Sequence, residues 1–141
     1  MAKLTVRKFS SPDETRPFQS RGRVDLLTVG GATVGRGVFE PGWKWSVDVK
    51  PIAGTERCEA SHSGYVLSGR MHVVMADGEE ADIEPGDYVA IPPGHDAWVV
   101  GKDTCVFLDF AGMEDYARAA REEAEKEDAR EILGMHFHEG A

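Results

Sequence analysis

The sequence predicts an all-β protein, a single antiparallel sandwich or barrel. From Val24 to Phe110, short runs of β-branched and aromatic residues alternate with Gly, Pro and Asp at intervals of about 8–12 residues. Turn dipeptides separate these runs, and Asp77-Gly78 is a favoured tight turn. The chain has 141 residues, of which 41% are hydrophobic, so it fits one compact domain with a core of its own.

The elements follow in order along the chain. Residues 1–22 mix charges with Ser and Pro, which predicts an arm that covers the domain and forms no regular element. Residues 23–112 form the predicted barrel, with a first hairpin turning near Gly30 and Gly31 and further turns at Ser68-Gly69 and Asp77-Gly78. Later strands are expected within residues 86–94 and 104–110.

The character of the chain changes after Gly112. Residues 113–134 are rich in Ala, Glu and Arg, place opposite charges four residues apart, as at Arg118 and Glu122, and close on Gly134. This pattern predicts a C-terminal α-helix with a solvated, charged face, followed by a tail over residues 135–141.

Bulk properties exclude several classes of partner. The formal net charge of −9 is opposite to what a nucleic-acid-binding protein needs. No run approaches the roughly eighteen apolar residues of a membrane span, and the first residues lack the apolar core of a signal peptide. Cys58 and Cys105 are the only cysteines, which suits a reducing compartment. We therefore expect a soluble, cytoplasmic protein with no nucleic-acid or membrane partner.

One stretch carries a specific resemblance. The motifs lie within "GYVLSGRMHVVMADGEEADIEPGDYVAIPPGHDAWVV". This stretch resembles the cupin superfamily, and the resemblance covers roughly Glu56 to Phe110. It implies a double-stranded β-helix, the cupin jelly-roll barrel. The preceding "FEPGWKWSVDVKPIAGTERC" is similar to a subgroup of small single-domain bacterial cupins, which brings no settled activity.

The metal-ligand positions implied by the resemblance carry altered residues. Counting from Gly69, the position usually held by Glu is His62, and the usual His-x-His pair falls on Glu56 and Cys58. Counting from Gly94, the usual His position is Ala97, whereas His95 stands two residues earlier.

Strand periodicity supports an interior position for this altered set. Glu56, Cys58 and His62 share one parity, and His95 shares the parity of Ala97, so all four face the interior if the ligand face is kept. Imidazole and thiolate donors favour zinc, iron or copper. The alternative is that Cys58 is a small buried apolar residue and His62 a hydrogen-bonded core residue.

The remaining histidines are left out of the set. A two-residue loop at Ser68-Gly69 would pair Tyr65 with His72 and place His72 on the face opposite to His62, although a loop longer by one residue would reverse this. His136 and His138 lie in the tail, where solvated histidines are expected.

Aromatic residues suggest a second kind of site. Trp43, Trp45 and Trp98 could line a ligand pocket or a subunit contact, and core packing is the alternative. Asp96 could orient the imidazole of His95 or cap the turn after Gly94.

Two classes of function follow. The first is a binding or sensing barrel that holds a small molecule, a divalent transition metal, or both in its interior. The alternative is a metal-dependent enzyme of oxygenase or isomerase type, acting on a small organic substrate. The binding role is favoured because no acid or base beyond the four candidate ligands can be placed inside. The resemblance to small cupins further implies a homodimer.

Overall fold

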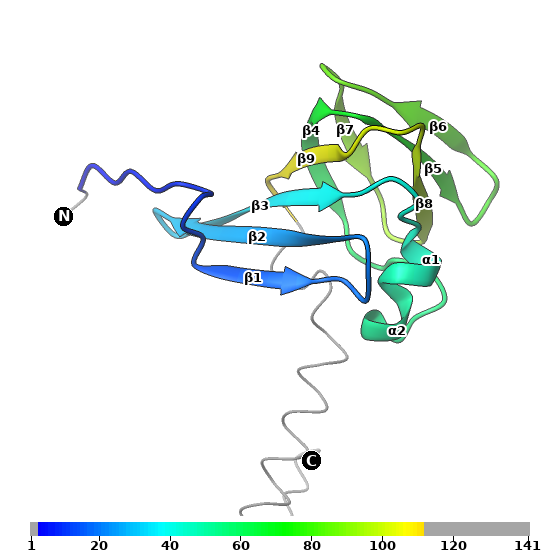
Figure 1. Cartoon of the computed structure of the whole chain (residues 1–141), viewed down its shortest axis with the longest axis horizontal. Helices are drawn as coiled ribbons and strands as arrows, with labels where there is room; N and C mark the ends of the chain where they lie inside the picture. Colours follow the sequence, from blue (N-terminus) through cyan, green and yellow to red (C-terminus); the bar gives the residue numbers. More distant parts are fainter. Residues whose placement is uncertain (1–2, 112–141) are drawn as a thin grey trace, which may run out of the picture.

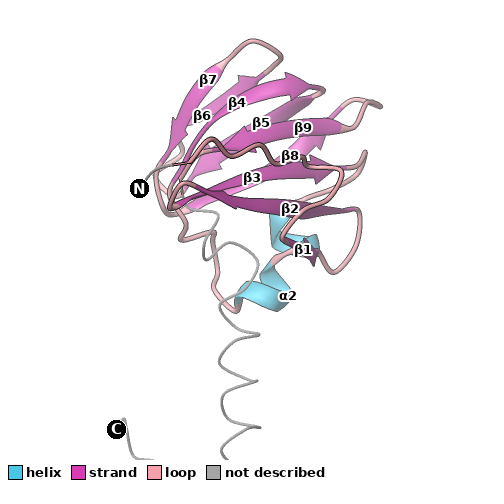
Figure 2. Ribbon diagram, turned by 90° about the vertical axis from the view of Figure 1, so that its left-hand side faces the viewer, coloured by secondary structure: helices cyan, strands magenta, loops and turns pink. Residues whose placement is uncertain are grey.

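The computed structural model describes residues 3–111, which form two antiparallel β-sheets facing each other around one core (Figures 1 and 2). The larger sheet has the strand order β1 (Glu14–Pro17), β2 (Gly22–Val29), β3 (Ala32–Phe39), β9 (Cys105–Asp109), β4 (His62–Ser68), β7 (Tyr88–Ile91). The smaller sheet has the order β6 (Glu80–Ile83), β5 (Arg70–Met75), β8 (His95–Val100). The predicted all-β, antiparallel architecture is confirmed for this part of the chain.

Two of the predicted turns are confirmed as hairpins. Strands β2 and β3 pair up to Val29 and Ala32, with Gly30 and Gly31 between them at φ 59° and 82°. Positive φ at both central residues is the geometry that favours glycine in a two-residue hairpin. The turn at Asp77-Gly78 likewise joins β5 to β6, which pair antiparallel.

The turn at Ser68-Gly69 differs from the prediction. It forms no hairpin, because β4 pairs with β7 and β9 in the larger sheet, while β5 pairs with β6 and β8 in the smaller one. The chain instead crosses here from one sheet to the other. Gly69 is required at this corner: its φ is 71°, and a Cβ would lie 2.5 Å from the Cα of Cys105.

The N-terminal arm is partly regular, which corrects the prediction. Residues Glu14–Pro17 form β1, an edge strand that pairs with β2, and the buried ring of Phe18 follows it into the core. The four-residue strand is too short to show alternation in the sequence, and Pro17, which lacks an N–H, ends it.

Two one-turn helices, which the sequence did not predict, follow β3. They are α1 (Trp45–Asp48), which lies beside β8 at one end of the barrel, and α2 (Lys50–Ala53), which follows α1 (Figure 1). The fully buried carboxylate of Asp48 anchors α1 by accepting hydrogen bonds from the Lys44 backbone N–H and the Arg21 guanidinium. The C-terminal helix and tail predicted over residues 113–134 and 135–141 lie outside the described residues.

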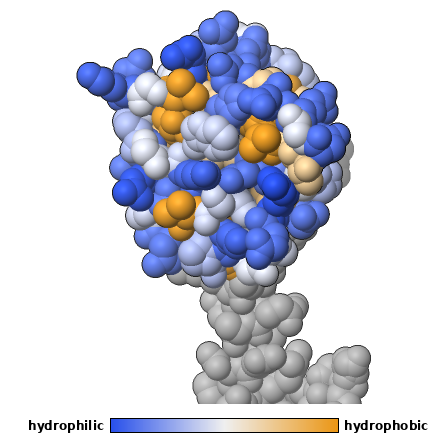
Figure 3. Space-filling view, turned by 90° about the vertical axis from the view of Figure 1, so that its right-hand side faces the viewer, coloured by the Kyte–Doolittle hydropathy of each residue, from blue (hydrophilic) through white to orange (hydrophobic). Residues whose placement is uncertain are grey.

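The core lies between the sheets and follows strand alternation. On β8 the residues His95, Ala97 and Val99 are buried and their neighbours are partly exposed. Outside the core, on the face drawn in Figure 3, apolar residues form separate groups among polar ones. Within residues 3–111 no helix is long and apolar enough to span a bilayer.

Candidate metal centre

Three candidate ligands meet inside the barrel. One donor atom from each of Cys58, His62 and His95 lies within 4.8 Å of the other two, and all three residues are buried. The two imidazole rings stand edge to face, with their centroids 5.1 Å apart. The structure therefore brings together three of the four residues that the sequence nominated.

Backbone pairing fixes Cys58 beside His95. The N–H of Cys58 donates to the carbonyl of His95 at 2.8 Å, and the N–H of Gly94 donates to the carbonyl of Cys58 at 2.7 Å. Cys58 thus extends the smaller sheet by one bridge past β8. His62 and His95 are the first residues of β4 and β8, so the site lies at one end of both sheets.

The hydrogen bond of His95 fixes its tautomer. Nδ1 of His95 lies 2.7 Å from the carbonyl oxygen of Pro92, which can only accept a hydrogen bond. Nδ1 therefore carries the proton, and in the neutral ring the lone pair is on Nε2. A backbone carbonyl that holds one ring nitrogen in this way is typical of histidines that bind metal through the other.

His62 is oriented in the same manner by Asp109. Its Nδ1 lies 2.5 Å from Oδ2 of Asp109, and its Nε2 lies 3.6 Å from Sγ of Cys58. Asp109 is fully buried, and its other oxygen accepts the backbone N–H of Ala111 at 3.0 Å. The carboxylate is thus positioned to hold His62 with Nε2 directed at the thiol.

Asp109 is the site residue that sequence reasoning missed. It shares the inward parity of Cys105 and Phe107 on the otherwise apolar β9, where the burial pattern alternates. A carboxylate at an inward position of an apolar strand needs a buried hydrogen-bond or charge partner, so its presence in a sequence indicates a buried polar site. That signal was present in "TCVFLDF".

The cluster is electrostatically coupled. Burial alone would raise the pKa of the Cys58 thiol, but hydrogen bonds and positive charge from His62 and His95 outweigh it and lower the pKa to about 6. Burial alone would lower the pKa of His62, but its hydrogen bonds with Asp109 and Cys58 raise the pKa to about 9. By contrast, burial raises the pKa of the other free cysteine, Cys105, to about 11.

The donor set fits a transition metal. One thiol and two imidazoles are the ligand types that zinc, iron and copper take from proteins. Both imidazoles have their Nδ1 atoms engaged by outer acceptors, which leaves Nε2 for the ion. The lowered pKa of Cys58 supplies a thiolate near neutral pH, and the thiolate is the form that binds metal.

Glu56 does not join the cluster. Its carboxylate pairs with Lys50 at 2.9 Å and its side chain is 91% exposed. The parity argument assumed an extended backbone from Glu56 to His62, but residues 55–57 form a bend, so the alternation of faces does not apply there.

His72 lies on the outer side of the smaller sheet, as the sequence predicted, although through a different pairing. It lies directly opposite Trp98 and Asp82 in the sheet, where Tyr65 had been expected. Its two ring nitrogens contact the exposed carboxylates of Asp82 and Glu80.

The predicted pocket residues divide into two groups. Trp43 and Trp45 are buried and line the cavity, which is one of the alternatives that the sequence left open. Trp98 does not line it: on β8 it faces outward, against His72 and beneath the Lys44 ammonium. Asp96 also lies outside the cavity, where its Oδ1 accepts the backbone N–H of Ser46 at 3.1 Å. Asp96 therefore joins α1 to β8 and does not orient His95.

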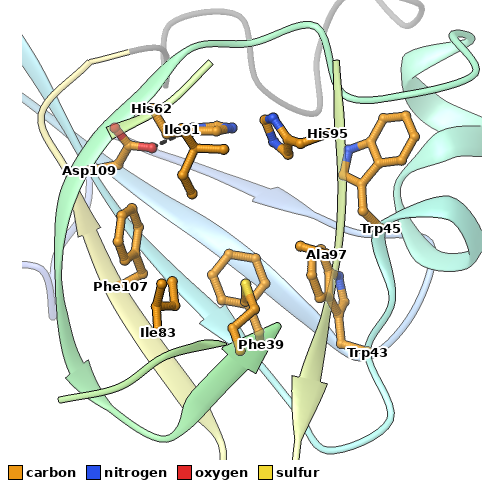
Figure 4. A pocket seen from close by; sticks show the side chains of 11 residues that line it. Phe39, Trp43, Trp45, His62, Ile83, Ile91, His95, Ala97, Phe107 and Asp109 are labelled. Atoms are coloured by element: carbon orange, nitrogen blue, oxygen red, sulfur yellow. Dashed lines mark hydrogen bonds and ion pairs between the residues drawn. The ribbon is translucent and has the colours of Figure 1, made fainter. Parts of the chain in front are cut away.

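The cavity is apolar except at the histidine end (Figure 4). Its volume is about 40 Å³. Eleven residues line it: Phe39, Trp43, Trp45, His62, Met71, Ile83, Ile91, His95, Ala97, Phe107 and Asp109. This volume is far below that of pockets that enclose drug-sized ligands, so the cavity suits a molecule of a few heavy atoms with a mostly apolar body.

Comparisons with known proteins agree with this architecture. The family model for the cupin domain matches residues 45–111. The fold is similar to the polyketide cyclase RemF from Streptomyces resistomycificus, with a TM-score of 0.55 and 22% identity over 77% of this chain and 79% of that one.

Two further solved structures are similar at a TM-score of 0.50 and 18% identity. A conserved protein with a double-stranded β-helix domain from Klebsiella pneumoniae matches over 78% of this chain and 92% of its own. An oxalate decarboxylase from Lactobacillus farciminis, in a formate complex, matches over 78% of this chain and 35% of its own. A search of curated proteins found no match. At these identities the solved structures show a shared fold, and this fold together with the match of the cupin-domain model to residues 45–111 supports a cupin superfamily member.

Proposed function

We propose that this barrel binds a divalent transition metal through Cys58, His62 and His95, and a small organic molecule in the cavity beside it, in a binding or sensing role. The observation that carries the proposal is the buried cluster in which both histidines have Nδ1 held by an outer acceptor. A bound ion would act there as a Lewis acid toward an oxygen of the ligand.

The cavity supports binding without turnover. Beyond the cluster its walls are aromatic and aliphatic, and the additional carboxylate, Asp109, is engaged by His62. Tyr65 cannot serve as an interior acid because its side chain faces outward and is exposed. Among the described residues that line the cavity, none remains as an independent general acid or base.

A metal-dependent enzyme is the second candidate, and the ligand count favours it. Structural metal sites usually have four protein ligands, whereas catalytic sites usually have three and leave a position for water or substrate. The loss of Glu56 from the set leaves three here. Turnover distinguishes the two: a bound molecule that the metal-loaded protein converts into a product, followed by mass spectrometry, supports the enzyme, and recovery of the molecule unchanged supports the binder.

Elemental analysis of protein purified without an affinity tag tests the metal itself. We expect close to one zinc, iron or copper ion per chain. His62→Ala and His95→Ala should each remove most of it, while His72→Ala, which alters an outward-facing histidine, should not. A metal-free protein, or equal metal content in all three variants, would refute the proposed centre.

We also propose that the protein is a cytoplasmic homodimer. The free, buried thiols of Cys58 and Cys105 are compatible with a reducing compartment. Two exposed tyrosines face outward from the larger sheet: Tyr65 on β4 and Tyr88 on the edge strand β7 are paired directly opposite each other. A second copy of the chain could cover both rings.

A further inference from the structure

We propose that the indole N–H of Trp45 donates a hydrogen bond to a carbonyl or carboxylate oxygen of the molecule that occupies the cavity. This inference rests on the proposed small-molecule site and narrows its ligand to a class. The ligand is a small molecule with a hydrocarbon body and a hydrogen-bond-accepting oxygen at one end.

The first observation is an unsatisfied donor. Trp45 is 1% exposed, and its Nε1 is buried with no hydrogen-bond partner among the described residues. Buried tryptophan N–H groups normally have an acceptor, because water is lost on burial and must be replaced. An unsatisfied donor in the wall of a cavity is therefore suited to an acceptor carried by a bound molecule.

The second observation is the direction in which the indole N–H of Trp45 points. Figure 4 shows the indole nitrogen of Trp45 on the side of its ring that faces His95. Trp45 and His95 both line the cavity. An oxygen bound at the histidine end would thus lie close to both the metal-binding residues and the Trp45 donor.

The third observation is that Trp45 is held in place. Its neighbour Ser46 donates its backbone N–H to Asp96 on β8, and the N–H of Val99 donates to the carbonyl of Trp43 at 3.0 Å. These two bonds fix α1 and the residues before it against β8. A donor fixed in advance gives specificity, because the protein does not reorganise to use it.

The cavity defines the rest of the ligand. Away from the histidines it is lined by Phe39, Met71, Ile83 and Phe107, none of which offers a polar atom apart from the weakly accepting thioether. The indole nitrogen of Trp43 is also unpaired, but Trp43 lies beside Phe39, at the end of the cavity away from the two histidines in Figure 4. Trp45 is therefore the donor nearest the polar end in Figure 4.

The experiment uses the full chain, both metal-free and zinc-loaded, with two probes of similar size: butanoate for a carboxylate oxygen and 2-butanone for a carbonyl oxygen. Indole 1H–15N resonances are assigned with Trp→Phe variants and followed during titration. We expect the Trp45 resonance to shift downfield with at least one probe. Trp45→Phe, which keeps an aromatic ring but removes the N–H, should weaken binding about three- to tenfold.

Trp98→Phe is the matched control, because Trp98 lies on the outer face against His72 and should leave probe affinity unchanged. If a probe binds and neither the Trp45 resonance nor the affinity of Trp45→Phe changes, the inference is overturned and the small-molecule site stands. If neither probe binds the metal-free or the zinc-loaded wild type, the small-molecule part of the proposed function fails, and the inference fails with it. If Trp45→Phe does not fold, the inference is tested by the wild type alone: a probe that binds without shifting the Trp45 indole resonance overturns it.

Discussion

Replacing Asp109 by Asn isolates the contribution of the buried carboxylate to the candidate metal centre. The carboxylate accepts a hydrogen bond from Nδ1 of His62, with 2.5 Å between Nδ1 and Oδ2. Because Asp109 is fully buried, its negative charge is little screened by solvent. Asn has nearly the same shape and can still accept a hydrogen bond through its oxygen. The change removes the negative charge behind His62 and, with the Asn oxygen on His62, also removes the acceptor of the Ala111 N–H.

The expected loss in metal affinity is about 10- to 100-fold, the usual effect of altering an outer partner of a metal-binding histidine. That corresponds to about 1.4–2.7 kcal/mol. The loss arises because a neutral acceptor makes the imidazole a weaker donor of electrons to the ion and holds its orientation less firmly. Zinc affinity is measured by competition with a chromophoric chelator, and circular dichroism checks that the variant is folded.

Asp82→Asn is the matched control. Asp82 contacts Nδ1 of His72 at the same distance of 2.5 Å, but on the exposed face of the smaller sheet. This variant should bind zinc like the wild type. Wild-type zinc affinity in the Asp109 variant would refute the role given to Asp109, and an equal loss in both variants would show that the effect is not specific to the cluster.

Three further predictions test the rest of the site and the assembly. Zinc affinity should fall about tenfold per pH unit as the pH is lowered from 9 to 6, because the metal must displace a proton from His62, whose pKa is about 9. Below pH 6 the affinity should fall more steeply, because the Cys58 thiolate, with a pKa of about 6, also takes up a proton. A zinc affinity that does not change with pH in a chelator competition would contradict this. Glu56→Gln should leave the metal content measured by elemental analysis unchanged, since Glu56 is exposed and paired with Lys50, and a loss of metal would return it to the ligand set. Light scattering should give twice the 15.4 kDa chain mass, and Tyr88→Glu should reduce it toward the monomer; a monomeric wild type at micromolar concentration would exclude the dimer.

Strand periodicity predicted the part of the site that is built from extended backbone. His62 and His95 begin regular strands, so the alternation of faces correctly placed both side chains inside. The same rule, applied along β8, would have excluded Trp98, because an inward His95 and Ala97 make Trp98 face outward. The error there came from grouping residues by type and not by parity.

Other features could not be read from the sequence because they depend on tertiary contacts. Glu56 lies outside the cluster because a bend interrupts the extended backbone before Cys58. The single-turn helix α1 carries no periodic pattern, and its position depends on Asp48 and on the bond from Ser46 to Asp96. The turn at Gly69 reads locally like a hairpin, although the pairing partners of β4 and β5 lie elsewhere in the chain.

The early position of His95 relative to Ala97 has a structural consequence for the site. Two residues along a strand keep the same face but move the side chain by about 6.6 Å, so His95 lies at the beginning of β8, where the backbone of Cys58 pairs with it. Ala97, at the usual position, lines the cavity with a methyl group instead of an imidazole. The displacement therefore moves the candidate metal centre toward one end of the barrel and leaves the interior at Ala97 open. That open, apolar interior, with the donor of Trp45 beside it, is the space in which the proposed ligand would lie.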